Sequence, residues 1–286
     1  MAGTSIGSFI AATMSDSSMP ARTTFTDKAG KILKKNSFLP LSKCYYSSQN
    51  LEKTLDHMLG DKTFSNIEKN ILITSYNLEK SEQTIFTNFG SEDSRQIMQG
   101  CAWGIDDIKL KDAVQASAAV PGFLKAKEIE YCRDDSGVKK YHEVDGAMQN
   151  MSPVMDLALA MHLLEEVDFK DMFIISVGTG TLKKDIMSSL QDKGCIGHLF
   201  SSKAIGVAHA CIVQEATENQ CKILVERSGG KFCKLEPQIS LDDFCSALND
   251  SKEQMNRYID IAQDYILQND SYLNEVAQQI LENCYL

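Results

Sequence analysis

The residues best suited to chemistry stand at the start of the chain, in the run Gly3-Thr4-Ser5-Ile6-Gly7. This run reads G-x-S-x-G, a pattern typical of a sharp turn from a strand into a helix, with the serine at its tip. We expect Gly3 and Gly7 to remove side chains where strand and helix pass closest. The helix dipole and the N–H of Ile6 would then face negative charge developing on a substrate bonded to Ser5. The same residues also fit an ordinary helix N-cap, by Thr4 or Ser5, on a glycine-flanked loop.

A second candidate group lies in the middle of the chain, in the run Glu143-Val144-Asp145-Gly146-Ala147. Residues 141–144 are predicted to form a strand, which would place Asp145 at its carboxyl end. In α/β sheets, sites gather at that end of the strands. An aspartate followed by glycine is also a common turn. The interpretation as a site therefore depends on the fold bringing Ser5 and Asp145 together at one rim of a shared sheet.

The composition is that of a soluble globular protein. The chain has 286 residues, of which 43% are hydrophobic and 24% charged, enough for one large domain or two modest ones. A net charge of -10 argues against nucleic-acid binding. Nine cysteines without a C-x-x-C pair indicate reduced thiols rather than a disulfide framework or a zinc site. We find neither a long apolar run that would span a membrane nor a basic start typical of a signal peptide.

Strand and helix patterns alternate along the chain, which favours a layered α/β fold. Strands are expected at 70–76, 84–88 and 126–144 (a pair), and at 172–177, where an apolar run suggests burial on both faces. Helices are expected at 5–15, 25–35, 47–59 before Gly60, 108–119 before Pro121, and after Ser152 and Pro153 as N-cap and first residue. The remainder is predicted to be mainly helical, with a β-like piece at 222–226.

Taken together, these stretches resemble the patatin-like phospholipases, which are lipid acyl hydrolases. The resemblance rests on segments that occur in the family's order: GTSIG, FTDKAGKIL near Phe25, LEKTLDHMLGD (51–61), ILITSYNLEKSEQTIFTNF, AVQASAAVPGF (113–123), VDGA (144–147) with Pro153, and ISVGTG (175–180). The AVQASAAVPGF run matches the family's A-x-x-A-S-x-A-x-P-x-F signature closely. The terminal helices match more weakly.

The resemblance implies a three-layer α/β/α sandwich that forms a single domain over 1–286, with a catalytic core at about 1–182 and a helical part at about 183–286. It implies a Ser–Asp dyad in which Ser5 is the nucleophile and Asp145 the general base. Thr4 and Ile6, with the two glycines, would complete the elbow, and Gly146 and Ala147 the D-G-A motif. No histidine, metal or cofactor is implied, and His142 would be structural. Substrates would be glycerophospholipids or neutral acylglycerols, met at a transient membrane surface, with no nucleic-acid partner.

The chain also departs from the family's pattern. Family members carry a strand, a glycine-rich oxyanion loop, a helix and a further strand before the elbow, whereas here only Met1 and Ala2 precede Gly3. Gly229-Gly230 lies too far downstream to be that loop. We therefore expect an N-terminally truncated domain whose numbering starts at an internal methionine. Met151 and Ser152 also replace the Asn-Asn pair that the family often has.

Two alternatives follow. The chain could be a catalytically impaired fragment or a non-catalytic binding module, because the oxyanion loop is absent. It could also be an α/β-hydrolase with a Ser-Asp-His triad, since His162, His198 and His209 follow Asp145 in the chain order of that fold. The family suggests a cytoplasmic or peripheral membrane location and leaves export open. The preferred lipid, the acyl position, the oligomeric state and the organism are not encoded in any pattern that we identify.

Overall fold

The computed structural model describes residues 1–15, 47–98, 100–102, 108–132, 137–182, 202–240 and 251–284. The segment FTDKAGKIL and the helix expected at 25–35 lie outside these residues. Contacts divide the chain into two compact units, Met1–Met172 with Ile212–Gly229 and Phe173–Cys211 with Gly230–Leu286. Both candidate motifs belong to the first unit. The single-domain assignment, with a boundary near residue 182, stays a prediction.

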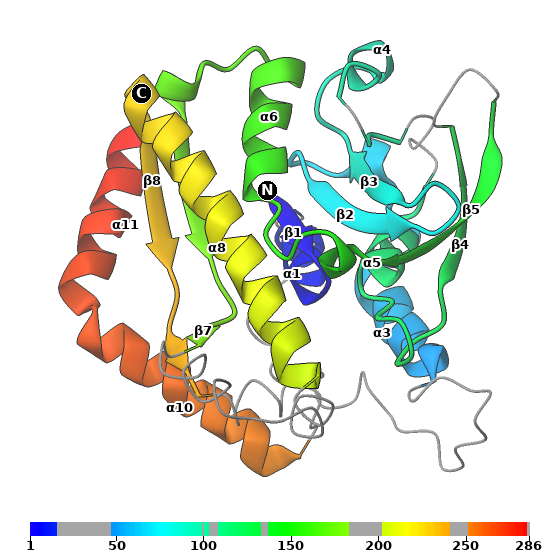
Figure 1. Cartoon of the computed structure of the whole chain (residues 1–286). Coiled ribbons are helices and arrows are strands. Elements are labelled where there is room, and N and C mark those ends of the chain that lie inside the picture. Colours follow the sequence, from blue (N-terminus) through cyan, green and yellow to red (C-terminus); the bar gives the residue numbers. More distant parts are fainter. Residues whose placement is uncertain are drawn as a thin grey trace. The chain divides into compact units, whose positions relative to one another are not determined.

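A five-stranded mixed sheet organises the first unit (Figure 1). Its strands are β1 (Ala2–Thr4), β2 (Leu72–Asn77), β3 (Glu82–Thr87), β4 (Lys127–Tyr131) and β5 (Lys139–Asp145). β3 pairs antiparallel with the whole of β2 on one side. On its other side, β2 pairs first with β1, in parallel, and then with β5, antiparallel. β1 and β5 therefore share one side of β2 and point their carboxyl ends at each other.

Helices cover both faces of this sheet. Alternation along β2 sends Ile71 and Ile73 to one face and Leu72 to the other, because successive strand residues point in opposite directions. The first face packs against α1 (Ile6–Met14), α3 (Ser48–Leu59) and α5 (Leu110–Ser117). The second face packs against α6 (Val154–Leu164). The predicted α/β fold, with three layers α/β/α, is thus present in this unit.

Capping residues, glycine and proline in the sequence predict the ends of these helices correctly, with one exception. The side chain of Ser47 caps α3 by accepting from the N–H of Gln49, and Gly60 follows with φ 57°. α5 ends shortly before Pro121, as expected. The prediction of Ser152 as the N-cap of α6 was wrong, since Pro153 holds that position. The side chain of Asn150 bonds both the N–H and the C=O of Ser152 and so keeps it in a turn.

Short elements connect these parts, namely η1 (Phe64–Asn66), α4 (Glu92–Arg95), η2 (Gly146–Met148) and η3 (Phe169–Asp171). The long helix α8 (Ser202–Ser228) contributes residues 212–229 to the first unit. The β-like piece expected at 222–226 was wrong, because these residues are helical. Cys221 and Val225 are one turn apart and both buried, so helical periodicity outweighs the β-propensity of the run.

The second unit holds two small parallel strand pairs and two terminal helices. β6 (Phe173–Val177) pairs with β8 (Lys231–Leu235), and β7 (Thr181–Leu182) pairs with β9 (Gln238–Ile239). The expected burial of residues 172–177 on both faces was wrong, since Val177 is 75% exposed. A sheet of two strands has no inner strand that could be covered throughout.

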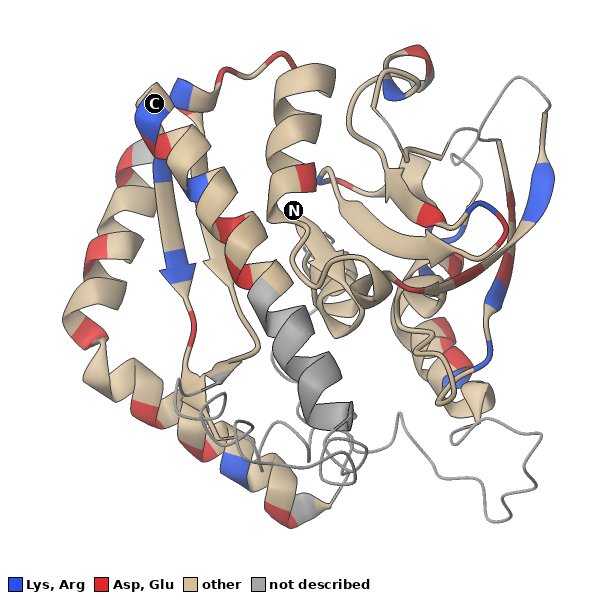
Figure 2. Cartoon of the chain, in the orientation of Figure 1, with Lys and Arg blue, Asp and Glu red and all other residues tan. Residues whose placement is uncertain are grey.

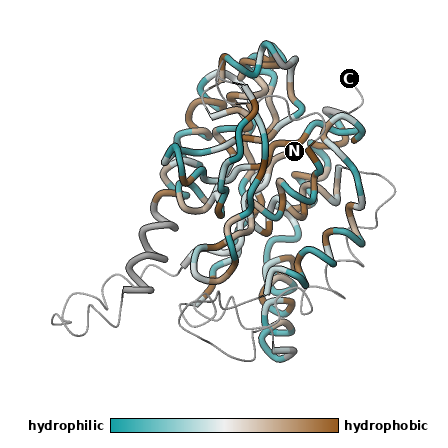
Figure 3. The backbone as a smooth tube through the Cα atoms, turned by 90° about the vertical axis from the view of Figure 1, so that its right-hand side faces the viewer, coloured by the Kyte–Doolittle hydropathy of each residue, from teal (hydrophilic) through white to brown (hydrophobic). Residues whose placement is uncertain are grey.

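The terminal helices are α10 (Lys252–Gln268) and α11 (Asp270–Cys284). In the hydropathy colouring of the backbone, helical tubes change between hydrophobic and hydrophilic along their length (Figure 3), which is typical of amphipathic helices. None of the described helices is both long and apolar enough to cross a lipid bilayer.

Candidate active site

Ser5 alone makes the turn between a strand and a helix. β1 ends at Thr4 and α1 begins at Ile6, so the backbone changes from extended to helical across a single residue. Ser5 has φ 55° and ψ -124°, a region that residues with a side chain rarely adopt. Such strain gathers at functional sites, where the surrounding structure holds it in place. The strand–turn–helix geometry expected from G-x-S-x-G is therefore present.

The two glycines of the elbow play different parts. A Cβ added to Gly3 would lie 2.1 Å from the carbonyl oxygen of Gly7, so only glycine fits at residue 3. A Cβ added to Gly7 would meet nothing within 4 Å. The expectation that both glycines relieve crowding was therefore right for Gly3 and wrong for Gly7. The backbone of the first helical turn is the crowded group, and a side chain on residue 7 points away from it.

Strand register brings Ser5 and Asp145 together. Thr4, the last residue of β1, pairs with Thr74, and Asp145, the last residue of β5, pairs with Ser75. The two strand ends thus face each other beside consecutive residues of β2. Ser5 Oγ donates to Asp145 Oδ2 at 2.6 Å, across a separation of 140 residues. The contact lies where two strands meet end to end within the sheet, and not at a rim as the sequence suggested.

The carboxylate of Asp145 is held on both oxygens. Oδ2 accepts from Ser5, and Oδ1 accepts from the N–H of Ala147 at 2.9 Å. A Cβ on Gly146 would lie 2.6 Å from the carbonyl oxygen of Thr74, so the backbone must be bare at that position. The D-G-A motif thus supplies a carboxylate, a close approach to β2 and an amide that orients the carboxylate.

Burial gives Asp145 a raised pKa. The side chain is only 2% exposed, and this desolvation raises its pKa to about 6 from an ordinary value of 3.8. The hydrogen bonds from Ser5 and from the N–H of Ala147 act in the opposite direction, because they favour the charged form. A carboxyl group that titrates near neutral pH beside a hydroxyl is well placed to accept that hydroxyl's proton.

Two side chains that the sequence reasoning missed support the elbow. Ser117 Oγ accepts from the N–H of Ser5 at 2.8 Å, and the hydroxyls of Thr4 and Thr74 bond each other at 2.6 Å. The signal that could have pointed to Ser117 is its place as the serine of the A-x-x-A-S-x-A-x-P-x-F signature. No pattern in the sequence pointed to Thr74.

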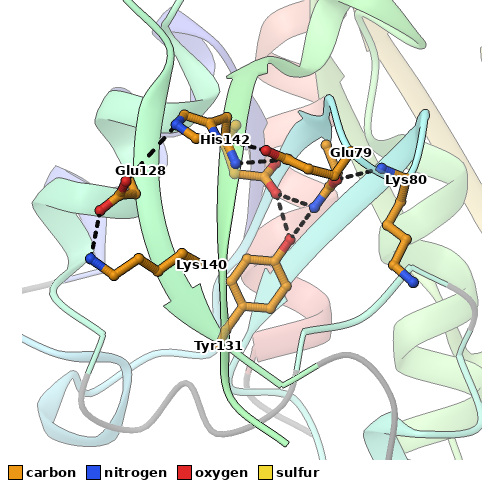
Figure 4. Close-up of polar contacts among 8 residues, drawn as sticks. Glu79, Lys80, Glu128, Tyr131, Lys140 and His142 are labelled. Carbon is orange, nitrogen blue, oxygen red and sulfur yellow. Dashed lines mark hydrogen bonds and ion pairs between the residues drawn. The ribbon is translucent and has the colours of Figure 1, made fainter. Parts of the chain in front are cut away.

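Behind Asp145 lies a second buried carboxyl group, that of Glu143. It accepts from four donors, which are Ser75 at 2.5 Å, Tyr131 at 2.5 Å, Asn77 at 3.0 Å and Thr84 at 3.1 Å. Figure 4 shows the hydroxyl of Tyr131 within this cluster. Burial raises the pKa of Glu143, and the four hydrogen bonds oppose that shift. Because its four donors come from β2, β3 and β4, Glu143 ties these strands to β5.

His142 and His162 make their contacts away from Ser5 and Asp145. His142 Nδ1 lies 2.6 Å from Glu79, and its Nε2 lies 3.9 Å from Glu128, which also binds Lys140 (Figure 4). His162 Nδ1 lies 3.1 Å from the carbonyl oxygen of Val167, and its ring stacks on Phe169. His198 and the side chain of His209 lie outside the described part. Ser5 Oγ bonds Asp145 directly, and neither His142 nor His162 takes part in that contact.

The surroundings of Ser5 are uncharged and partly apolar. β1 and α1 carry no Lys, Arg, Asp or Glu, whereas such residues mark most other elements (Figure 2). Ile6, Ile10 and Met14 follow one another at helical spacing along α1 and are 41%, 41% and 48% exposed. This exposed face of α1 starts directly beside Ser5. Within the described ranges, no cluster of three or more His, Cys, Asp or Glu could hold a metal ion.

Comparisons with known proteins agree with this geometry. The family model described as patatin-like phospholipase matches residues 1–158, which include both motifs of the site. The chain is 23% identical over 206 residues to Patatin-like protein 1 of Arabidopsis thaliana, covering 63% of this chain and 48% of that protein. It is also 23% identical over 147 residues to Patatin-2-Kuras 2 of Solanum tuberosum, covering 48% of this chain and 36% of that protein.

The chain thus spans about half, or less, of the length of the curated relatives it matches. The family model nevertheless covers more than half of this chain and contains the whole elbow and the D-G-A motif. On that match, the chain belongs to the patatin-like phospholipase family.

Proposed function

We propose that this chain is a lipid acyl hydrolase of the phospholipase A or acylglycerol lipase type, with Ser5 as nucleophile and Asp145 as general base. The observation that carries the proposal is the 2.6 Å hydrogen bond from Ser5 Oγ to Asp145 Oδ2. Family membership supports hydrolase chemistry in general. The dyad and the lipid substrate are our inference from the site.

The proposed reaction has two halves. As Ser5 Oγ bonds to the ester carbonyl carbon, its proton moves to Asp145, and the carbonyl oxygen becomes an oxyanion. Collapse of this tetrahedral intermediate breaks the bond to the alcohol, which leaves with the proton from Asp145. Water then attacks the acyl-serine while Asp145 accepts a proton, and the fatty acid is released as Ser5 regains its hydrogen. None of these steps calls for a cofactor or a metal.

Oxyanion stabilisation is the demanding part of this reaction. The N–H of Ile6 stands at the start of α1, where the helix itself provides no partner for it, and the positive end of the helix dipole lies there too. The N–H of Ser5 is already bonded to Ser117. The elbow therefore offers the N–H of Ile6 as an oxyanion donor, and loss of one such donor typically lowers the rate by about 10²–10³. A site that relied on this donor would be slow, which is the basis of a second candidate function, a weakly active or non-catalytic family member.

The exposed face of α1 supports an apolar acyl group as the substrate's reacting part. Ile6, Ile10 and Met14 extend from the nucleophile over two helical turns, and the absence of charge on β1 and α1 suits a hydrocarbon chain. We infer a lipid surface as the working partner, which fits a cytoplasmic or peripheral membrane location.

Turnover by the purified chain tests the chemistry. The substrates are phosphatidylcholine vesicles, emulsified triacylglycerol, and p-nitrophenyl esters of four and sixteen carbons. Ser5→Ala and Asp145→Asn are expected to abolish hydrolysis. Ser15→Ala is the matched control, because Ser15 is buried at the far end of α1 and its hydroxyl donates to the carbonyl of Ala12 in the last turn of that helix. Turnover retained in Ser5→Ala or Asp145→Asn would refute the dyad. A folded wild-type chain without turnover would support the second candidate.

Chain-length preference tests the substrate class. Ile10→Glu places a charge on the exposed face of α1 and is expected to lower turnover of the sixteen-carbon ester at least tenfold more than that of the four-carbon ester. The control is Ile97→Glu, since Ile97 is 69% exposed and lies in the turn after α4. Equal losses on both esters would contradict an acyl contact along α1.

A further inference from the structure

Ser117 stands at the junction between α5 and the elbow. It is the last residue of α5 and has no exposed surface. Its Oγ accepts a 2.8 Å hydrogen bond from the N–H of Ser5, 112 residues earlier in the chain. The acceptor for this N–H is a side chain and not the ladder of the sheet, while the carbonyl oxygen of Ser5 accepts from the N–H and the hydroxyl of Ser8.

The residues just after Ser117 hold the other half of the dyad. The carbonyl oxygen of Ala119 accepts a 3.1 Å hydrogen bond from the N–H of Asp145. α5 has ended at Ser117, so the carbonyl of Ala119 lies beyond the helix and is available to a neighbouring strand. A single stretch, residues 117–119, therefore accepts from the backbone N–H groups of both Ser5 and Asp145.

Small residues allow α5 to come this close. Ala113 and Ala116 are fully buried in the core that α5 shares with α1 and the sheet. A larger side chain on this face would push α5 away from β1, and the Ser117 hydroxyl would lose contact with the Ser5 amide. The signature A-x-x-A-S-x-A-x-P-x-F thus has a physical meaning here: close packing, an acceptor for the nucleophile's amide and a free carbonyl for the base.

We propose that Ser117 is a positioning residue that holds Ser5 in its strained elbow conformation and thereby aims Oγ at Asp145. This inference rests on the proposed function and deepens it. Without the Ser117 acceptor, the partly buried N–H of Ser5 loses this partner, and the backbone at φ 55° relaxes toward common values. The Ser5 hydroxyl then spends most of its time away from the near-attack geometry.

Kinetics of three variants test the catalytic consequence. Ser117→Ala is expected to lower kcat for p-nitrophenyl esters by 10- to 100-fold while KM changes less than twofold, because substrate contacts are untouched. Ser117→Thr keeps the Oγ acceptor and is expected to recover at least a third of the wild-type kcat. Ser15→Ala removes an equally buried serine hydroxyl elsewhere and is expected to keep kcat within twofold. A kcat within twofold of wild type in Ser117→Ala would overturn the proposal.

Amide hydrogen exchange at Ser5, followed by NMR, tests the contact itself. Exchange at this amide is expected to be at least tenfold faster in Ser117→Ala than in the wild-type chain, and unchanged in Ser15→Ala. If Ser117→Ala fails to fold, Ser117→Cys replaces it, because sulfur keeps the volume and is a weak acceptor. Unchanged protection of Ser5 would overturn the proposal even if kcat fell.

The two readouts separate this proposal from the function on which it rests. If Ser5→Ala retains wild-type turnover, or if the wild-type chain has none, the proposed function fails, and the exchange rate at Ser5 alone decides the role of Ser117. If Ser5→Ala is inactive while Ser117→Ala is fully active, the function stands and the positioning role is wrong.

Discussion

Thr4 and Asp145 lie opposite consecutive residues of β2, Thr74 and Ser75, at the ends of two strands that approach from opposite directions. This register sets the distance between the elbow and the carboxylate. A slip of one residue in either pairing would turn the strand's last side chain to the other face of the sheet. The geometry of the candidate site thus depends on how β1 and β5 both pair with β2.

The raised pKa of Asp145 sets the expected pH dependence of activity. Asp145 must be ionised to accept the proton of Ser5, and burial places its pKa at about 6. We therefore expect kcat/KM to rise with pH along a limb centred near pH 6, where a solvent-exposed aspartate would give a limb near pH 4. The measurement is kcat/KM for a p-nitrophenyl ester between pH 4 and pH 8. A flat profile above pH 5 would contradict this prediction.

Because burial raises the pKa of Asp145, the ionised form of this residue lowers the stability of the folded chain at neutral pH. Between about pH 4 and pH 6 the folded chain binds more protons at Asp145 than the unfolded chain, so this residue lowers the free energy of unfolding as pH rises through that window. The difference between 3.8 and about 6 corresponds to about 3 kcal/mol. Asp145→Asn removes the titration while keeping the shape of the side chain.

We expect the stability gained by Asp145→Asn to increase from pH 4 to pH 7 by about 2–3 kcal/mol, while turnover is lost. Urea unfolding of both proteins at the two pH values measures it. A gain that is the same at pH 4 and pH 7 would show that the carboxyl is not desolvated in the folded chain.

The two elbow glycines predict opposite responses to alanine. Gly3→Ala drives a Cβ into the carbonyl of Gly7 and is expected to destabilise the chain by about 3 kcal/mol or more. Gly7→Ala meets open space within a helix and is expected to be neutral or to stabilise by up to about 1 kcal/mol. Thermal unfolding of the pair measures the difference. Comparable losses in both variants would contradict the crowding seen at Gly3.

Two neighbouring tyrosines offer a matched pair in the core. Their rings lie 4.7 Å apart between centroids. The hydroxyl of Tyr131 donates to Glu143, whereas that of Tyr141 is buried without a hydrogen-bond partner among the described residues. Tyr131→Phe leaves Glu143 short of a donor and is expected to lower the free energy of unfolding by about 1–3 kcal/mol.

Tyr141→Phe serves as the control for that substitution. It removes an unsatisfied hydroxyl and is expected to leave stability unchanged or to raise it slightly. Equal effects of Tyr131→Phe and Tyr141→Phe in urea unfolding would argue against a contribution from the Glu143 cluster.

Much of the first unit could be predicted from the sequence because its signals are local. Ser47 and Gly60 mark the ends of α3, Pro121 limits α5, and short runs rich in β-branched residues mark β2 and β3. The elbow and the D-G-A turn were predicted for the same reason, since each is a short pattern with a definite backbone geometry.

Features that depend on distant partners were missed. The end-to-end meeting of β1 and β5 depends on the register of both with β2, and no local pattern encodes it. The open space beside Gly7 and the contact of Ser117 with Ser5 are likewise settled by packing. At residues 222–226 a local signal was misleading, because burial of Cys221 and Val225 on one helix face outweighs the β-propensity of the run.

The most direct test of the central claim is covalent labelling by a fluorophosphonate, which reacts with activated serine hydroxyls. Peptide mapping by mass spectrometry after brief exposure identifies the labelled residue and its rate. We predict a single fast adduct on Ser5 in the wild-type chain, no adduct at that peptide in Ser5→Ala, and labelling at least 100-fold slower in Asp145→Asn. Fast labelling of another serine, or an undiminished rate on Ser5 without the Asp145 carboxylate, would contradict it.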